Sequence, residues 1–186
     1  MQQKLIILDR DGVINYDSDE YIKSPGEWRP IEGSLEAIAR LNRAGYIVTV
    51  ASNQSGIARG YFDLQTLSAI HAKMDTMLAQ EGGRIDAIFF CPHRPEDHCR
   101  CRKPKPAMLL DIGQRFNVSL EEVYFIGDTV GDMKTAYAAN ARPLLVRTGK
   151  GSKAELILNA ECKQKIPIYD DLSSAADAIL DGSVQS

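Results

Sequence analysis

The sequence predicts an α/β fold: a single Rossmann-like domain with three layers and a mainly parallel sheet. Short apolar runs rich in Val, Ile and Phe alternate with longer stretches in which apolar residues recur at helical spacing. Four of the apolar runs end directly at polar, reactive residues, as strands do at the carboxyl edge of a parallel sheet. The length of 186 residues suits one domain, so we expect residues 1–186 to fold as a unit.

The first part of the chain is expected to contain one strand, one loop and one helix. The apolar run 4–8 stops at Asp9, as a buried parallel strand does. Residues 15–30 hold Asp, Ser, Pro and Gly, which favours a loop. From Ser34 onward apolar residues recur three and four positions apart, and Gly45 provides the helix stop.

The middle of the chain repeats this alternation. Residues 46–51 are rich in β-branched side chains and indicate a strand, and Asp63 is placed to cap a helix over 64–80. The apolar run 85–90 predicts the third strand, which leads into a cysteine-rich segment. Pro106 suits the first turn of the next helix, because a backbone amide proton is not needed there.

The last part is expected to contain three more strands, over 122–126, 143–149 and 166–171. An alanine-rich helix over 132–140 separates the first two, and another helix follows the last strand. Only the stretch 149–165 shows no clear pattern. We expect this C-terminal part to belong to the same domain.

Charge and hydropathy exclude some classes of protein. The 22 Lys and Arg against 25 Asp and Glu give a net charge of −3, which argues against a nucleic-acid partner. A small anionic substrate is compatible with this charge, because a few cations can bind it. The longest apolar run is far shorter than the about 20 residues needed to cross a bilayer, and the N-terminus lacks a signal peptide. We expect a cytoplasmic monomer without a membrane partner.

Three of the four cysteines lie within eleven residues, beside two histidines. Three thiolates and one imidazole form the ligand set of a closed structural Zn²⁺ site. The expected ligands are Cys91, His93, Cys99 and Cys101. His98 competes for the fourth place; we prefer His93 because the C-x-H and C-x-C arms then mirror each other. A chance cluster of thiols is the alternative, and Cys162 is expected to be an ordinary isolated thiol.

Four predicted strands run directly into loops that carry reactive side chains. Because the carboxyl ends of parallel strands meet at one edge of the sheet, these loops are expected to converge. They are residues 9–12, residues 52–55, the zinc loop of residues 91–103, and residues 127–132.

The side chains on these loops suit phosphoryl transfer. Asp9 and Asp11 can divide nucleophilic attack and proton transfer between them, although a D-x-D pair alone is usually just solvated. Oxygen ligands from Asp9 and Asp128 suit Mg²⁺. Ser52 can donate a hydrogen bond to a phosphoryl oxygen, and the Arg-Lys pair that ends the zinc loop can neutralise its charge. No dinucleotide-binding or P-loop glycine pattern offers another phosphate site.

Four sequence blocks resemble the haloacid dehalogenase superfamily of aspartate-nucleophile phosphatases. The blocks are LDRDGVIN (8–15), SNQSGIARG (52–60), CRKPKP (101–106) and GDTVGDM (127–133). With the zinc loop and VRTGKG (146–151), they are similar to the histidinol-phosphatase-like branch, and the likeness covers roughly residues 4–151. The resemblance implies an Mg²⁺-dependent phosphatase that acts on a small sugar bisphosphate.

The resemblance also implies a role for each matching residue. Asp9 would attack phosphorus, Asp11 would donate and then accept the proton, and Ser52 and Lys103 would hold the transferring phosphoryl group. Mg²⁺ would be bound by Asp9, the backbone carbonyl of Asp11, and Asp128. The implied substrate-binding residues are Arg10, Asp17, Asp19, Glu20, Tyr21, Asn53, Gln54, Ser55, Arg102 and Thr129.

Two positions depart from the family pattern. Ser52 stands where many relatives have Thr, which keeps the hydroxyl. Thr129 stands where some relatives have Lys, so the sequence leaves open whether a cation contacts the substrate phosphate at this position. The 42 residues between Asp9 and Ser52, and the 50 between Ser52 and Lys103, are filled by predicted elements. We therefore expect no separate cap domain and an open site.

Two other functions stay open from the sequence. A histidinol-phosphate phosphatase would use the same catalytic residues, and only the substrate would differ. A non-catalytic, zinc-braced binding module is the alternative of another class. Such modules usually lack a nucleophile or a metal ligand, and none is missing from this sequence.

Overall fold

The computed structural model describes residues 3–161 and 165–184, and it confirms the α/β fold. The strands of this part of the chain form one parallel sheet in the order β3-β2-β1-β4-β5-β6. They are β1 (Lys4–Leu8), β2 (Tyr46–Asn53), β3 (Ala87–Cys91), β4 (Tyr124–Gly127), β5 (Arg142–Val146) and β6 (Ile168–Tyr169). Cys162 lies outside the described residues.

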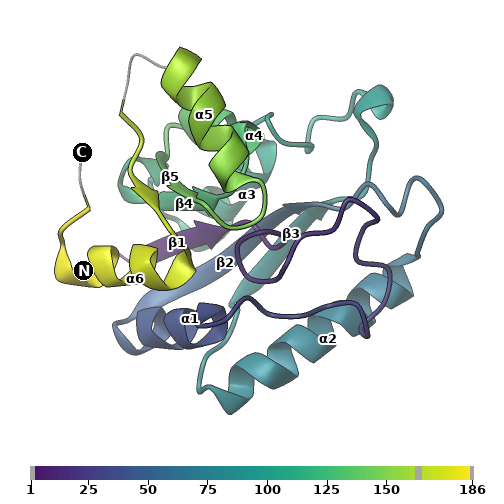
Figure 1. Ribbon diagram of the computed structural model, residues 1–186, viewed down its shortest axis with the longest axis horizontal. Helices are drawn as coiled ribbons and strands as arrows, with labels where there is room; N and C mark the ends of the chain where they lie inside the picture. Colours follow the sequence, from purple (N-terminus) through teal and green to yellow (C-terminus); the bar gives the residue numbers. More distant parts are fainter. Residues whose placement is uncertain (1–2, 162–164, 185–186) are drawn as a thin grey trace.

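Helices cover both faces of the sheet (Figure 1). They are α1 (Ser34–Arg43), α2 (Leu64–Gln80), α3 (Ala107–Phe116), α4 (Val130–Ala138), α5 (Gly151–Glu161) and α6 (Leu172–Asp181). One face is covered by α1, α2 and α6, and the other by α3, α4 and α5. None of the helices in the described residues combines the length and apolar composition that a membrane crossing requires.

The residues of β1 show how the sheet divides the core. Successive side chains of a strand point to opposite faces. Ile6 and Leu8 pack with the helices α1, α2 and α6, whereas Leu5 and Ile7 pack with α3 and α4. All four side chains are at most 3% exposed. The strand β1 therefore lies buried on both faces in the middle of the sheet.

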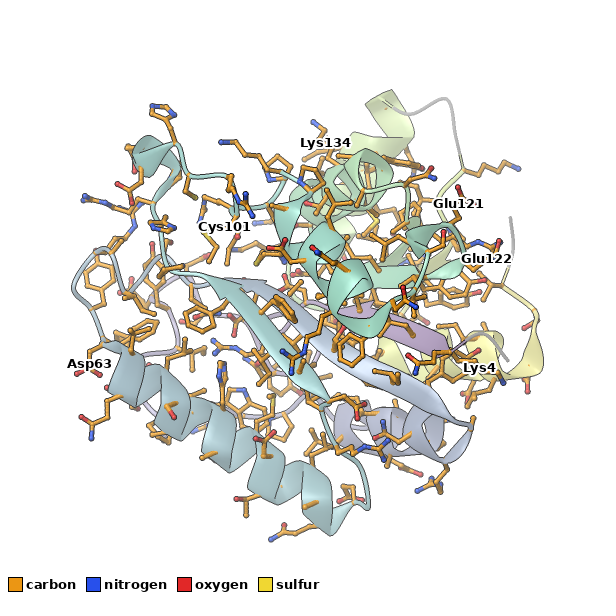
Figure 2. All side chains as sticks on the ribbon, turned by 180° about the vertical axis from the view of Figure 1, so that it is seen from behind. Lys4, Asp63, Cys101, Glu121, Glu122 and Lys134 are labelled. Carbon is orange, nitrogen blue, oxygen red and sulfur yellow. The ribbon has the colours of Figure 1, made fainter. Side chains whose placement is uncertain are left out.

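The local signals at helix starts agree with the structure. The carboxylate of Asp63 accepts a hydrogen bond from the backbone amide of Thr66 at 2.7 Å, which caps α2 at its N-terminal end (Figure 2). Pro106 directly precedes α3. Capping satisfies amide groups that have no partner within the helix, so a polar residue at that position marks the boundary.

The C-terminal third differs from the sequence expectation. Residues 149–165, which show no clear pattern, contain the helix α5. Ala154 and Leu158 of this helix are buried, while Leu156 is 73% exposed. Apolar residues on the solvent side hide the helical periodicity. The strand expected over 166–171 is reduced to the two residues of β6, which pairs only with β5 at the edge of the sheet.

The order of the strands decides where a ligand can bind. From β1 the sheet extends one way through β2 and β3 and the other way through β4, β5 and β6. The direction of winding reverses between β1 and β4, and in open parallel sheets a crevice forms there at the carboxyl edge. Asp9 follows β1 and Asp128 follows β4. Both carboxylates therefore stand at this crevice.

Candidate active site

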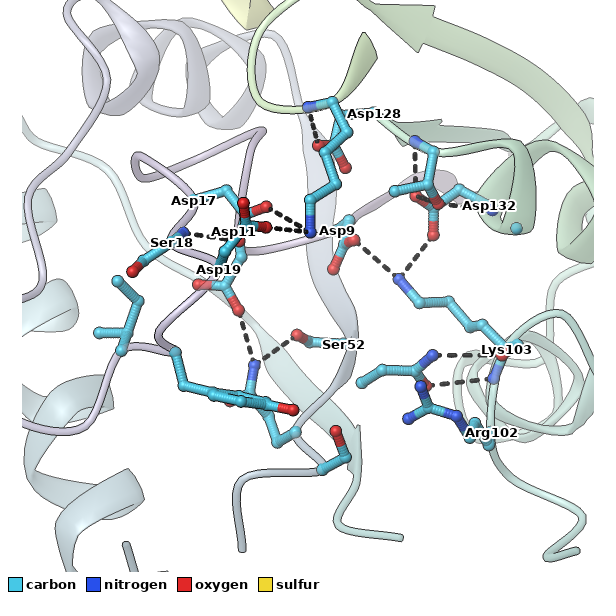
Figure 3. A pocket seen from close by; sticks show the side chains of 18 residues that line it. Asp9, Asp11, Asp17, Ser18, Asp19, Ser52, Arg102, Lys103, Asp128 and Asp132 are labelled. Carbon is cyan, nitrogen blue, oxygen red and sulfur yellow. Dashed lines mark hydrogen bonds and ion pairs between the residues drawn. The ribbon is translucent and has the colours of Figure 1, made fainter. Parts of the chain in front are cut away.

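A polar pocket of about 320 Å³ lies at the crevice (Figure 3). Its walls come from the loops after β1, β2, β4 and β5 and from the end of the zinc loop. All five residues proposed for catalysis or for Mg²⁺ line it, namely Asp9, Asp11, Ser52, Lys103 and Asp128. Of the ten substrate-binding candidates, all except Arg10 and Glu20 line it as well. The structure thus brings the four predicted loops together.

Lys103 places a positive charge beside the predicted nucleophile. Its side chain is buried, and its ammonium lies 2.9 Å from Asp9 Oδ2 and 2.6 Å from Asp132 Oδ1. The ammonium also donates a hydrogen bond to the backbone carbonyl of Ala51 at 2.9 Å. Burial lowers the pKa of Lys103, but the two carboxylates outweigh burial, and the pKa lies above its usual value. The charge is therefore fixed where a phosphoryl group would need it.

Asp9, Asp128 and Asp132 form a buried acidic cluster. One carboxylate oxygen of each lies within 4.8 Å of the others. Burial is the largest cause that raises the pKa of Asp9 to about 7 and that of Asp128 to about 8, and the neighbouring carboxylates raise both further. Within the described residues, Asp128 Oδ1 is buried without a hydrogen-bond partner. These oxygens fit Mg²⁺, whose charge would favour their ionised forms.

The two oxygens of Asp132 are already occupied. Oδ1 pairs with Lys103, and Oδ2 accepts hydrogen bonds from the backbone amide and the hydroxyl of Thr129, at 3.1 and 2.5 Å. The hydroxyl of Thr129 in turn accepts a hydrogen bond from the amide of Asp132, which caps α4. Asp132 therefore orients Lys103, and of the two carboxylates after β4, Asp128 is the better candidate for a metal ligand, because its Oδ1 has neither a hydrogen bond nor an ion pair among the described residues.

A glycine allows the loop after β1 to approach Asp128 closely. Gly12 has a φ of +83°, and a Cβ at this position would lie 2.1 Å from Asp128 Oδ2. The same oxygen accepts a hydrogen bond from the backbone amide of Lys150 at 2.8 Å. Asp128 is thus held through Oδ2, while its other oxygen, Oδ1, has no hydrogen-bond partner among the described residues.

Asp11 lies in a network of hydrogen-bond donors. Arg10 donates through Nε at 3.1 Å and Nη2 at 2.9 Å, and Asn15 and Gln54 each donate at 2.9 Å. Gln54 Nε2 also donates to the hydroxyl of Ser52 at 2.8 Å. Burial raises the pKa of Asp11, but the charge of Arg10 and the hydrogen bonds outweigh burial, and the pKa lies below its usual value.

Two of the substrate-binding candidates, Arg10 and Glu20, lie outside the pocket lining. Arg10 is fully buried, and beyond Asp11 it contacts Gln54 Oε1 at 3.2 Å and His71 Nε2 at 3.4 Å. Its guanidinium orients Asp11 and is not among the groups that line the pocket. Glu20 is exposed and lies outside the lining.

The four predicted zinc ligands come together at the end of β3. The sulfur atoms of Cys91, Cys99 and Cys101 lie 3.1–3.6 Å apart, and His93 Nδ1 lies 3.6 Å from Cys91 and 3.4 Å from Cys101. Tetrahedral Zn²⁺ with Zn–S bonds of about 2.3 Å places thiolates about 3.8 Å apart, so the cluster fits zinc after small shifts. The group contains His93 and not His98.

The zinc loop ends in two cations of the pocket. Arg102 Nη1 donates to the backbone carbonyl of His93 at 3.2 Å, so the position of Arg102 depends on the zinc loop. The side chain of Asn53 exchanges two hydrogen bonds with the backbone of Lys103, at 3.1 and 3.2 Å. These contacts tie the loop to the end of β2.

Five residues that line the pocket were given no role from the sequence, although some of them lie in the predicted loops. They are Ser18, Ile22, Gly131, Asp132 and Lys150. A signal for Lys150 was present, because it follows a predicted strand at the same carboxyl edge within the block VRTGKG. For Asp132 the signal was its position one helical turn after Asp128. Neither signal says where a side chain points.

Known proteins resemble this chain over nearly its whole length. A family model described as HAD-hydrolase-like matches residues 100–175. The D-glycero-beta-D-manno-heptose-1,7-bisphosphate 7-phosphatase of Pseudomonas aeruginosa is 51% identical over 180 residues, covering 97% of this chain and 99% of that relative. The protein of the same name from Bordetella bronchiseptica is 50% identical over 177 residues, covering 95% and 98%.

A solved structure is similar as well. The crystal structure of D,D-heptose 1,7-bisphosphate phosphatase from Bordetella bronchiseptica, complexed with magnesium and phosphate, superimposes with a TM-score of 0.92 at 50% identity. The match covers 96% of this chain and 99% of that one. Fold, site and these likenesses define the class of the protein as a HAD-like hydrolase, a phosphatase. Within this class, the chain belongs to the family of the D-glycero-beta-D-manno-heptose-1,7-bisphosphate 7-phosphatases.

Proposed function

We propose that this protein removes the 7-phosphate of D-glycero-beta-D-manno-heptose 1,7-bisphosphate through an aspartyl-phosphate intermediate. The observation that carries the proposal is the joint position of Asp9, Lys103 and Asp128 at one crevice of the sheet. A nucleophile, a fixed cation and an oxygen ligand for Mg²⁺ are the parts that phosphoryl transfer requires. The names of the relatives support the choice of substrate.

The chemical steps follow from the surroundings of the two carboxyl groups after β1. Asp9 attacks phosphorus, and Lys103 and Ser52 stabilise the oxygens of the transferring group. Asp11 protonates the leaving sugar oxygen and then accepts a proton from the attacking water. A phosphate dianion beside Asp11 raises the pKa of this carboxyl and so favours the acid form in the first step. After the sugar leaves, Arg10 stabilises the charged form that serves as the base.

Mg²⁺ and Zn²⁺ would bind at different sites and have different roles. Mg²⁺, bound by Asp9, Asp128 and the backbone carbonyl of Asp11, neutralises charge on the phosphoryl oxygens. In the zinc loop, Cys91, His93, Cys99 and Cys101 would hold Zn²⁺ in a structural role, since four protein ligands would leave no position for a substrate. Arg102, held by that loop, binds the sugar or its remaining phosphate. The residues Asp17, Asp19 and Tyr21 contact the sugar from the opposite loop.

The product would serve the synthesis of ADP-heptose and of the lipopolysaccharide core. The cytoplasmic location and the monomeric state expected from the sequence stay predictions; sedimentation of the purified protein tests the second. No observation favours histidinol phosphate as the substrate. A non-catalytic binding module is excluded as a class, because the chain belongs to a phosphatase family.

The test is phosphate release in Mg²⁺ from three substrates: the β and α anomers of the heptose bisphosphate, and histidinol phosphate. We expect the highest kcat/KM for the β anomer. Asp9→Asn should lower kcat by at least about a thousandfold, because the nucleophile is lost. Asp75→Asn, an exposed carboxylate on α2, is the matched control and should keep full activity. Preference for histidinol phosphate, or full activity of Asp9→Asn, would overturn the proposal.

A further inference from the structure

Lys150 is a pocket cation with no role in the proposed mechanism. It precedes α5, and its side chain is half exposed. Its ammonium lies 3.1 Å from Asp17 Oδ2 and 3.3 Å from Asp19 Oδ1. Lys103 is buried among its partners and cannot leave them without cost. Lys150, by contrast, joins two loops through ion pairs that water can reach.

These ion pairs form a wall between the pocket and a second hollow. The second hollow measures about 550 Å³ and is lined in part by Tyr16, Lys153 and Ile157. Lys150, Asp17 and Asp19 line both spaces. The contact between them therefore lies on the border of the two spaces.

The segment of residues 17–21 needs such contacts to keep its place. Tyr21 has a φ of +66°, a conformation that costs free energy for a residue with a Cβ and persists only when its surroundings hold it. Its ring packs on that of Tyr61 at a centroid distance of 5.1 Å, which anchors one end of the segment. Lys150 anchors the other end through Asp17 and Asp19.

Charge gives Lys150 a second effect on binding. The side chains that line the pocket include six aspartates, and the cations are Arg102, Lys103 and Lys150. Asp17 and Asp19 line the pocket that would take a substrate with two phosphates. Without a cation between them, they would repel such a substrate.

We propose that Lys150 is a positioning residue that latches residues 17–19 over the pocket and neutralises their charge, and so increases the affinity for a bisphosphate substrate. The inference rests on the proposed function for its choice of substrate. The side chain of Lys150 lies at the wall and not at the reacting centre, so it acts on KM and not on kcat. Its backbone amide, which binds Asp128, is unaffected by substitution.

The test compares Lys150→Met with Lys153→Met, which removes an exposed lysine of the same charge three residues further along. We expect Lys150→Met to raise KM for the heptose bisphosphate about 3- to 10-fold with kcat changed less than about twofold. Lys153→Met should match the wild type, and Lys150→Arg should restore most of the loss. The ratio of the KM values should fall toward one at 0.5 M salt, because salt screens exposed ion pairs.

Amide hydrogen exchange gives a readout that does not depend on the substrate. In the protein without substrate, residues 16–22 should exchange at least about threefold faster in Lys150→Met than in the wild type or in Lys153→Met. Unchanged exchange together with unchanged KM would refute the latch, and so would a fall in kcat alone. If the wild type does not hydrolyse the heptose bisphosphate, the proposed function fails, and exchange alone still decides whether the latch exists.

Discussion

Protons and Mg²⁺ should compete for Asp9 and Asp128. Without a metal, burial raises the pKa of Asp9 to about 7 and that of Asp128 to about 8. With these values, both carboxyls are ionised in about one molecule in a thousand at pH 6 and in nearly half at pH 8. The apparent affinity for Mg²⁺ should therefore rise by roughly two to three orders of magnitude over this range. Binding at pH 7 should release between one and two protons, about 1.4 with these pKa values.

The same pKa values connect stability to pH. The folded-state values lie above those of the unfolded chain, so these carboxyls contribute stability that is fully present below about pH 4. That contribution is lost as the pH rises through 7 and 8. Mg²⁺ opposes the loss, because it binds the ionised forms in the folded protein only. The increase in Tm on adding Mg²⁺ should be larger at pH 8 than at pH 6.

Isothermal titration calorimetry at pH 6, 7 and 8, in two buffers that differ in ionisation enthalpy, measures both affinity and proton release. Asp128→Asn should weaken binding and flatten its pH dependence, because one titrating ligand is gone. Asp75→Asn, the exposed control on α2, should behave as the wild type. An affinity that changes less than about fivefold between pH 6 and 8, with no proton released, would refute the reasoning.

Three further predictions concern Gly12, the zinc loop and Arg10. Gly12→Ala puts a Cβ 2.1 Å from Asp128 Oδ2, so this substitution should abolish the Mg²⁺ binding that calorimetry measures and lower kcat/KM at least about a hundredfold. The control is Gly45→Ala, which has a similar φ of +85° but lies in open space. It should lower the free energy of unfolding by only about 1–2 kcal/mol. Removing zinc with a chelator should raise KM for the heptose bisphosphate, because Arg102 loses its fixed position, while Mg²⁺ still binds. Full activity of a protein whose zinc content has been measured and found to be lost would contradict this prediction. Arg10→Met leaves a buried carboxylate without its cation and should lower the free energy of unfolding by about 3–5 kcal/mol, or Tm by roughly 10 °C in a thermal melt. A change in Tm below about 2 °C would show that this pair is not structural.

Much of the site could be predicted because its residues follow strands. A run of apolar residues that stops at Asp9 or at Asp128 defines both a strand and the place where its side-chain chemistry begins. Parallel strands end at one edge, so such residues converge whatever the order of the strands. The cysteine cluster was equally local, since its four ligand residues lie within eleven positions. The helix α5 was missed because its exposed Leu156 hides the periodicity that burial would produce.

By itself, the sequence determined the alternation of strands and helices, the loops that meet at the site, and the four members of the Cys/His cluster that could hold a metal ion. Only the tertiary structure decided the strand order that sets β1 beside β4. It also decided where the charged side chains point: Arg10 inward to Asp11, and Lys150 across the pocket to Asp17. The physical reason is that periodicity and spacing are local properties of a chain. Which charge neutralises which carboxylate depends on the packing of segments far apart in the sequence.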